Sequence, residues 1–148
     1  QITPLFLITL FILMISNCSS EKIPWADSTL NEAIQLSNDK LIMIDFYADW
    51  CSPCQQLDQN TFSDSTVIEY CKNNFINLKI NTDTEYGYEV YNEFNVNALP
   101  MILFIDSGKH IVGKIEGYYG PLEYLNKIKN INDDFMNPSI ISEIKNGL

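Results

Sequence analysis

Hydrophobic and polar positions along the chain predict a regular succession of strands and helices. The run 41–47 (LIMIDFY) is strongly apolar and has the length of a strand, which predicts a central strand buried on both faces. Apolar or alternating runs predict further strands at 75–81, 101–106 and 110–116. Helical spacing and capping residues predict helices at 29–36, 53–60, 65–73, 85–94 and 121–131. The first helix is expected to follow a cap at Asp27 or Ser28.

The order of these elements indicates the fold class. From the N-terminus it is α-β-α-α-β-α-β-β-α, and the short turn Ser107-Gly108-Lys109 joins the last two strands. Strands separated by helices can pair in parallel, whereas a closing hairpin is antiparallel. We therefore predict an α/β domain with a mixed central β-sheet that is flanked by helices on both faces.

Residues 2–15 differ from the rest of the chain because they form a nearly uninterrupted apolar run. The run is shorter than the about 20 residues of a membrane-spanning helix, but it matches the apolar region of a secretory signal peptide. The sequence begins with Gln1, so we expect the initiating Met and the positively charged region of the signal to be missing from it. We assign residues 1–17 to a signal peptide and expect the domain to lie outside the cytoplasm.

The end of this run indicates how the domain is attached. Ile15-Ser16-Asn17-Cys18 resembles the bacterial lipoprotein cleavage motif, in which an aliphatic residue precedes by three positions a cysteine that becomes the acylated first residue. We predict lipidation of Cys18, with residues 18–24 as a tether, and membrane attachment through the N-terminus only. Asn17 stands where the motif has a small residue, so an uncleaved anchor and a plain signal peptide remain alternatives.

Composition narrows the function classes. The 148 residues carry 19 acidic and 9 basic side chains, a formal net charge of −10. This length suffices for one domain with a core, and 46% hydrophobic residues argue against disorder. Neither nucleic acid nor an anionic lipid surface is attracted to an acidic chain without a basic cluster. We therefore expect no nucleic-acid partner.

The candidate reactive site is the segment Trp50-Cys51-Ser52-Pro53-Cys54, between a predicted buried strand and a predicted helix. Cys51 falls near the helix N-cap, where backbone N–H groups and the helix dipole stabilise a thiolate. Cys54 returns to the same face one turn later, close enough for a disulfide with Cys51. Such a pair exchanges with a substrate disulfide, because the exposed thiolate forms a mixed disulfide that the second cysteine resolves.

Other roles for the cysteines fit this sequence less well. A structural zinc site needs about four ligands, but the sequence has no second cysteine pair and a single histidine, His110. A c-type haem site needs histidine directly after Cys54, where Gln55 stands. We predict no metal site, and an inert structural disulfide remains an alternative. Cys71 is predicted to be a buried small hydrophobe rather than a third redox thiol.

The segment 44–54 (IDFYADWCSPC) resembles the active-site segment of the thioredoxin superfamily. The stretch 61–64 (TFSD), with Val67 beyond it, is similar to periplasmic thioredoxin-like proteins, including the C-terminal domain of DsbD. Trp25 and Leu99-Pro100 fit the same pattern. The resemblance implies a thioredoxin fold and thiol–disulfide exchange. We assign residues 25–132 to a thioredoxin-like domain and residues 133–148 to a C-terminal extension.

The resemblance also implies a substrate-binding region. Pro100 matches the family's cis-proline, which packs beside the cysteine pair and leaves the backbone of Leu99 free to pair with a substrate chain. The alternative is an ordinary trans proline at the start of a strand. Trp50 matches the ring that flanks the active site, and Gly117 matches the small residue where substrate approaches. The residues between the cysteines depart from the family's Gly-Pro, because they are Ser-Pro.

Asp45, six residues before Cys51, matches the buried acid of thioredoxins that exchanges a proton with the second cysteine. Burial raises the pKa of a carboxyl group, and deprotonation of Cys54 needs a base poised near neutrality. The alternative is a carboxylate that merely pairs with Lys79 on the neighbouring strand, since structural ion pairs also perturb acids.

Together, these features predict an extracytoplasmic thiol–disulfide oxidoreductase, an enzyme that acts through Cys51 and Cys54 and needs no cofactor besides their disulfide. The expected partners are disulfide-containing extracytoplasmic proteins and a membrane electron donor, on the periplasmic or cell-surface side of a bacterial membrane. Two alternatives remain. One is a redox-inactive thioredoxin-fold module that binds a partner protein, and the other is a reductant dedicated to cytochrome c maturation.

Local charge predicts the direction of electron flow. Asp45 and Asp49 lie near the cysteine pair, and no basic residue occurs between Lys40 and Lys72. Like charge disfavours a thiolate, so the pKa of Cys51 should fall only modestly below the free value of about 8.5. A strong oxidant needs a heavily stabilised thiolate. We therefore predict a comparatively reducing dithiol, that is, a disulfide reductase.

Overall fold

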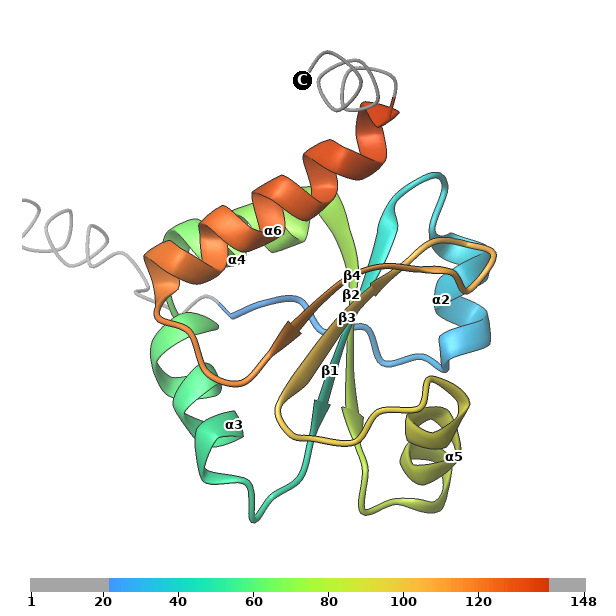
Figure 1. Cartoon of the computed structure of the whole chain (residues 1–148), viewed down its shortest axis with the longest axis vertical. Coiled ribbons are helices and arrows are strands. Elements are labelled where there is room, and N and C mark those ends of the chain that lie inside the picture. Colours follow the sequence, from blue (N-terminus) through green and yellow to red (C-terminus); the bar gives the residue numbers. More distant parts are fainter. Residues whose placement is uncertain (1–21, 139–148) are drawn as a thin grey trace, which may run out of the picture.

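A computed structural model describes residues 22–138, in which a mixed sheet lies between two layers of helices (Figure 1). The strands are β1 (Leu41–Tyr47), β2 (Phe75–Asn81), β3 (Met101–Ile105) and β4 (Ile111–Glu116). Their order in the sheet is β2-β1-β3-β4. Strand β1 is parallel to β2 and antiparallel to β3, and β3 and β4 form an antiparallel hairpin. The predicted α/β class and mixed sheet are confirmed.

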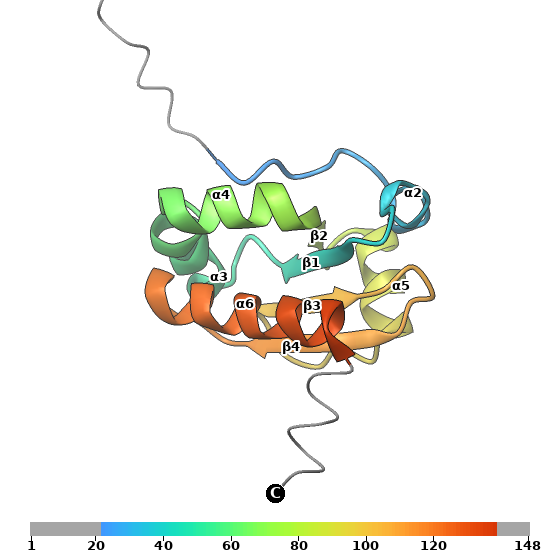
Figure 2. The ribbon, with the colours of Figure 1, turned by 90° about the horizontal axis from the view of Figure 1, so that it is seen from above.

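The helices divide between the two faces of the sheet, as both views show (Figures 1 and 2). One face is covered by α2 (Leu30–Leu36) and α5 (Glu85–Glu93). The other face is covered by the remaining helical segments, which are α3 (Ser52–Gln56), η1 (Leu57–Thr61), α4 (Ser65–Asn74) and α6 (Pro121–Met136). Each face has its own hydrophobic core, so the sheet is buried from both sides.

Strand β1 is buried almost throughout, as its uniform apolar character predicts. Its side chains alternate between the two cores. Ile42, Ile44 and Phe46 enter the core beside α2 and α5, whereas Leu41 and Met43 enter the core beneath α4 and α6. Asp45 follows the second set, so a charged residue of the central strand lies on the same side of the sheet as the helix that carries Cys54.

The first helix starts later than its expected cap. Its N-cap is Thr29, not Asp27 or Ser28. The Thr29 hydroxyl accepts a hydrogen bond from the backbone N–H of Glu32, and the Glu32 carboxylate accepts one from the backbone N–H of Thr29 at 2.7 Å. This reciprocal capping box satisfies two helix-end N–H groups.

The helix after the cysteines is not regular over its whole length. We predicted one helix at 53–60, but α3 ends at Gln56 and a π-helical turn, η1, follows. The N–H of Phe62 donates to the carbonyl of Leu57 at 2.8 Å, and the Thr61 hydroxyl donates to the carbonyl of Tyr119 at 2.6 Å. A wider turn changes the direction in which side chains point, and here Asp58 faces Lys79 on β2.

The last helix is longer than predicted, because α6 continues beyond Ile131 to Met136. The additional turn is supported by Phe135, which packs against the core, and by the amide of Asn132, which donates to the Tyr70 hydroxyl at 3.3 Å. Proline occurs next at Pro138, so no helix breaker stops α6 earlier. The helix therefore runs across position 133, where we placed the start of the C-terminal extension.

The signal peptide, Cys18 and the tether up to residue 21 lie outside the described residues, as does the extension from residue 139. Within residues 22–138, none of the helices combines the length and apolar character that crossing a membrane requires.

Candidate active site

The two cysteines lie at the junction of β1 and α3, where they form a disulfide. Cys51 is the N-cap of α3, and its sulfur accepts a hydrogen bond of 3.3 Å from the backbone N–H of Cys54. The two Cα atoms are 5.3 Å apart, since residues three positions apart share a helix face. Pro53 lies in the first turn, where its missing N–H costs no helical hydrogen bond. The structure thus brings the predicted pair together.

The segment before β3 packs beside the disulfide. The peptide bond between Leu99 and Pro100 is cis, as the resemblance implies. The Leu99 side chain packs against the small cluster formed by Ala48 and the two cysteines. The Pro100 carbonyl accepts a hydrogen bond of 3.0 Å from the N–H of Gly117, which follows β4. Residues from three separate parts of the chain therefore meet around Cys51 and Cys54.

Gly117 is required by its backbone rather than by lack of space. Its φ is +83°, a left-handed conformation that glycine adopts without strain. A Cβ atom built at this position would meet no heavy atom within 4 Å. The space beside Gly117 is therefore open.

Trp50 lies at the rim of the site, with 71% of its surface exposed. Its indole N–H donates to a carboxylate oxygen of Asp83 at 3.2 Å, which holds the ring against the segment after β2. A large aromatic surface that stays exposed and is fixed in place suits contact with another protein. Asp83 was not foreseen from the sequence, because 33 positions separate it from Trp50.

Asp45 is buried beneath α3 and pairs with Lys79. The pairing of β1 with β2 places the two residues opposite one another, and the Lys79 ammonium nitrogen lies 3.3 Å from Oδ2 of Asp45. The same ammonium contacts Asp58 of η1. The other carboxylate oxygen of Asp45, Oδ1, is buried and accepts no hydrogen bond from any residue within 22–138.

Burial raises the pKa of Asp45 to about 6, although the nearby Lys79 ammonium lowers it and Asp58 raises it further. Burial dominates because an ionised carboxylate loses its hydration when it leaves water. The two sequence-based interpretations of Asp45 are therefore not exclusive. Asp45 pairs with Lys79, and it still has the proton affinity that a general base near neutrality needs.

Sequence reasoning missed Asp58 and underestimated Lys79. The charge count around the cysteines extended only from Lys40 to Lys72, so it omitted the ammonium that β2 brings to Asp45. Asp58 lies four residues after Cys54, and this helical spacing was an available signal for its position near the site.

Cys71 is separate from this site. It lies within α4, fully buried, and its thiol donates to the sulfur of Met43 at 3.9 Å. Burial raises the pKa of Cys71 to about 12, so this thiol is a packing group, as its helical pattern predicted. Across the part of the chain that the structure describes, no group of three or more histidine, cysteine or carboxylate side chains is arranged to hold a metal ion.

One related protein and two solved structures show which known proteins this chain is similar to. The DsbD thiol:disulfide interchange protein of Campylobacter jejuni is 36% identical over 101 residues, which cover 68% of this chain and 18% of that protein. The solution structure of a candidate disulphide-isomerase from Bacteroides thetaiotaomicron is 32% identical with a TM-score of 0.66, covering 76% of this chain and 94% of that one. The oxidised C-terminal domain of Neisseria meningitidis DsbD, at 18% identity, has a TM-score of 0.58 and covers 68% of this chain and 87% of that one.

These likenesses differ in what they establish. The Neisseria domain supports the fold alone, and the chain spans only 18% of the length of the Campylobacter protein. The Bacteroides structure, in contrast, is matched over nearly its whole length. The family model for thioredoxin matches residues 21–130, which is most of the sequence and includes every element from α2 to β4. This chain therefore belongs to the thioredoxin family.

Proposed function

We propose that this chain is an extracytoplasmic disulfide reductase in which Cys51 attacks and Cys54 resolves. The coarser assignment follows from the family, because a thioredoxin-family domain with a disulfide between Cys51 and Cys54 is a thiol–disulfide oxidoreductase. The observation that carries the proposal is the position of this pair, at the start of α3 and beside the cis Leu99–Pro100 bond.

The proposed reaction begins with the reduced pair. The Cys51 thiolate attacks one sulfur of a partner's disulfide, and the partner's other sulfur leaves as a thiolate. Cys51 is the attacking sulfur in this scheme because it caps the helix and faces the N–H of Cys54. The first step forms a mixed disulfide between Cys51 and the partner.

Resolution of the mixed disulfide requires the second cysteine as a thiolate. In the proposal, the Cys54 thiol gives its proton to the Asp45 carboxylate and its sulfur attacks Cys51. The partner's second sulfur leaves as a thiolate and takes up a proton. When the Cys51–Cys54 disulfide forms, this chain passes two electrons to the partner, whose two thiolates take up protons from water. The proton that Asp45 accepted from Cys54 is then released to water, so the net transfer is two electrons and two protons. The disulfide is the redox group, so the reaction needs no further cofactor.

The surroundings of the pair support reduction rather than oxidation of partners. Asp49 precedes Cys51 by two positions, and Asp83 contacts the neighbouring Trp50, so two carboxylates belong to the surroundings of the pair. Negative charge nearby disfavours a thiolate, and the reduced form of the pair is then not strongly stabilised. Lys79 offsets part of this effect, because its ammonium contacts Asp45 and Asp58.

The location and partners belong to the same proposal. The apolar run at residues 2–15 and the motif at Cys18 support secretion and lipid attachment at the periplasmic or cell-surface side of a bacterial membrane. DsbD, the relative in Campylobacter jejuni, is named as a thiol:disulfide interchange protein. We accordingly propose disulfide-containing extracytoplasmic proteins as substrates and a membrane protein as the electron donor.

Insulin reduction with dithiothreitol as donor tests the activity. The wild-type chain should accelerate precipitation of the insulin B chain, and Cys51→Ser should reduce the rate to that of dithiothreitol alone. Cys54→Ser should instead accumulate mixed disulfides with partner proteins, which non-reducing gels resolve. A wild-type rate no higher than that of dithiothreitol alone would contradict the proposal and favour a redox-inactive binding module.

A further inference from the structure

The ammonium group of Lys79 lies in a cage of three aromatic rings. Its nitrogen is 4.8 Å from the ring centroid of Tyr47, 5.2 Å from that of Trp25 and 5.7 Å from that of Phe62. All three distances are within the about 6 Å over which a cation is attracted to a ring face. Two carboxylates, Asp45 and Asp58, contact the same nitrogen. A lysine on an edge strand of the sheet is therefore held on several sides.

The ring of Trp25 reaches this cage from outside the sheet. The segment around Trp25 lies along β2, where Trp25 forms a bridge with Asn77 and the N–H of Ala26 donates to the Asn77 carbonyl at 2.8 Å. The Trp25 ring also packs edge-on against Phe62, with centroids 5.3 Å apart. Ile23, two residues earlier, is buried. The N-terminal segment is thus fixed to the domain at the point where it meets Lys79.

A pocket of about 290 Å³ opens next to the cage. It is lined by Lys22, Trp25, Asp58, Phe62, Ser63 and Lys79. Lys79 has an open space into which its long side chain can turn, and water in that space would compete with Asp45 for the ammonium. The Lys79 ammonium must therefore be held toward the Asp45 carboxylate for its charge to act there.

We propose that Trp25, Tyr47 and Phe62 hold the Lys79 ammonium between Asp45 and Asp58, and that Trp25 and Asp58 are positioning residues for proton transfer from Cys54. The inference rests on the proposed role of Asp45 as the proton acceptor. Trp25 acts through Lys79, and Asp58 acts through Lys79 and through its own repulsion of the Asp45 carboxylate. Through Trp25, the N-terminal segment then adjusts the pH at which the resolving step works.

The physical reason is that one cation is shared by two anions. Desolvation raises the pKa of Asp45, Lys79 lowers it and Asp58 raises it. An ammonium fixed between the two carboxylates gives Asp45 only part of its stabilising charge. An ammonium that turns toward water stabilises the ionised Asp45 carboxylate less. Asp58 then changes the pKa of Asp45 less through Lys79.

Other titratable groups also face the cluster. Lys22 of the N-terminal segment lines the pocket. Tyr124 of α6 interacts with Asp45, and burial raises the pKa of this phenol well above its usual value, so it stays neutral in the working range. Lys79, Asp45 and Asp58 are therefore the interacting charges on β2, β1 and η1, with Lys22 at the mouth of the pocket.

The test follows the titration of the Asp45 carboxyl carbon by ¹³C NMR in the oxidised protein. Asp58→Asn should lower the midpoint, because the charge of Asp58 no longer repels the Asp45 carboxylate and the Lys79 ammonium then pairs with Asp45 alone. In a Trp25→Leu background the same Asp58→Asn change should shift the midpoint by less than half as much. Trp25→Phe should restore the full shift, since a phenyl ring can still face the ammonium. If Trp25→Leu does not fold, Trp25→Met takes its place.

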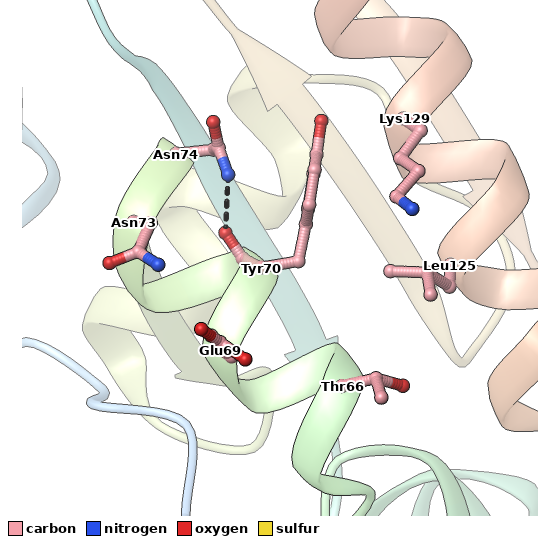
Figure 3. Close-up of a pocket in the computed structure, with 7 residues that line it drawn as sticks. All are labelled: Thr66, Glu69, Tyr70, Asn73, Asn74, Leu125 and Lys129. Atoms are coloured by element: carbon pink, nitrogen blue, oxygen red, sulfur yellow. Dashed lines mark hydrogen bonds between the residues drawn. The ribbon is translucent and has the colours of Figure 1, made fainter.

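A matched control is a second contact between a lysine and an aromatic ring, located between α4 and α6. The ring of Tyr70 faces the ammonium of Lys129 at 5.7 Å, in the pocket between α4 and α6 (Figure 3). Tyr70 is also packed edge-on against a phenylalanine, Phe75. Tyr70→Leu therefore removes a comparable ring from a lysine that does not contact Asp45. It should leave both the Asp45 midpoint and its response to Asp58→Asn unchanged.

Two results overturn the proposal. One is an Asp58→Asn shift of the same size with and without the Trp25 ring, which would show that the cage does not position Lys79. The other is an unchanged midpoint in Asp58→Asn. Failure of the underlying function is distinguished by Asp45→Asn, because an unaltered rate of mixed-disulfide resolution in that variant refutes the role of Asp45 while the NMR shifts still report the cage.

Discussion

The start of α3 and the inner face of α4 both bury cysteines, but they prepare them for different roles. Cys51 and Cys54 are each 4% exposed and Cys71 is 0% exposed, so exposure barely separates them. The sulfur of Cys51 faces a backbone N–H at a helix start, whereas the thiol of Cys71 faces the sulfur of Met43. The comparison teaches that cysteines of similar exposure differ in reactivity when one lies at a helix N-terminus and the other is surrounded by apolar groups inside a helix layer.

The largest expected difference between the two regions is in activity. Cys51→Ser should abolish insulin reduction, because no sulfur remains to form the mixed disulfide. Cys71→Ser should retain the wild-type rate, since Cys71 belongs to the packing of α4. The two variants are measured side by side at equal folded concentration. A loss of activity in Cys71→Ser without a loss of folded protein would contradict the comparison.

The second difference is in alkylation of the reduced, native protein. With its pKa raised to about 12, Cys71 carries at pH 8 only on the order of one thiolate per ten thousand molecules. Cys51 should react first with iodoacetamide, and Cys71 should react only after denaturation. Mass spectrometry of peptides after timed quenching gives the order. Early labelling of Cys71, or labelling of Cys54 before Cys51, would reverse the assignment.

A third difference concerns the acid beside the reactive region. The pKa of Asp45 is about 6 in the folded protein against an ordinary value of 3.8. Between these pH values the folded protein binds more protons than the unfolded chain, so the free energy of unfolding falls as the pH rises from about 4 to about 6. The loss amounts to about 3 kcal/mol and persists at higher pH.

Asp45→Asn removes this titration, so its free energy of unfolding relative to wild type should increase between pH 4 and pH 7. Urea unfolding of both oxidised proteins at the two pH values measures the change. Carboxylates whose pKa values are lowered, such as Asp64 and Asp106, have the opposite pH dependence, but they are common to both proteins and cancel. An identical pH dependence in the two proteins would place the pKa of Asp45 near its ordinary value.

The smallest expected effect is on the packing of α4. Cys71→Ala removes a buried sulfur from the core and leaves a cavity about the size of a methyl group, which costs about 1 kcal/mol of unfolding free energy. Ser65→Ala, on the exposed first turn of the same helix, is the control and should cost less. Thermal or urea unfolding distinguishes the two. A neutral Cys71→Ala would mean that the surrounding side chains collapse into the space.

Much of this architecture was predictable because it depends on local patterns. The ranges predicted for β1 and β2, 41–47 and 75–81, are those observed. In a short segment, a uniformly apolar or alternating pattern favours a strand. The cysteine pair was equally visible, because a helix start after a buried strand is a local feature. The expected position of each element differed from the observed one mainly at its ends.

The features that the sequence did not predict depend on contacts between distant segments. The π-helical turn at Leu57–Thr61 depends on contacts such as the hydrogen bond from Thr61 to Tyr119, 58 positions away. The extra turn of α6 is supported by the contact between Asn132 and Tyr70. The rings around Lys79 come from three separate segments. No local pattern encodes such a meeting, although the spacing of Asp58 from Cys54 could have indicated one member.

The equilibrium reduction potential of the Cys51–Cys54 pair tests the account most directly. It is measured by equilibrating the protein with defined ratios of reduced and oxidised glutathione and quantifying the two forms after acid quenching. A disulfide reductase whose attacking thiolate is not strongly stabilised should have a potential close to that of thioredoxin, about −270 mV. A value above about −180 mV, the potential of protein disulfide isomerase, would contradict the account and indicate an oxidase or isomerase.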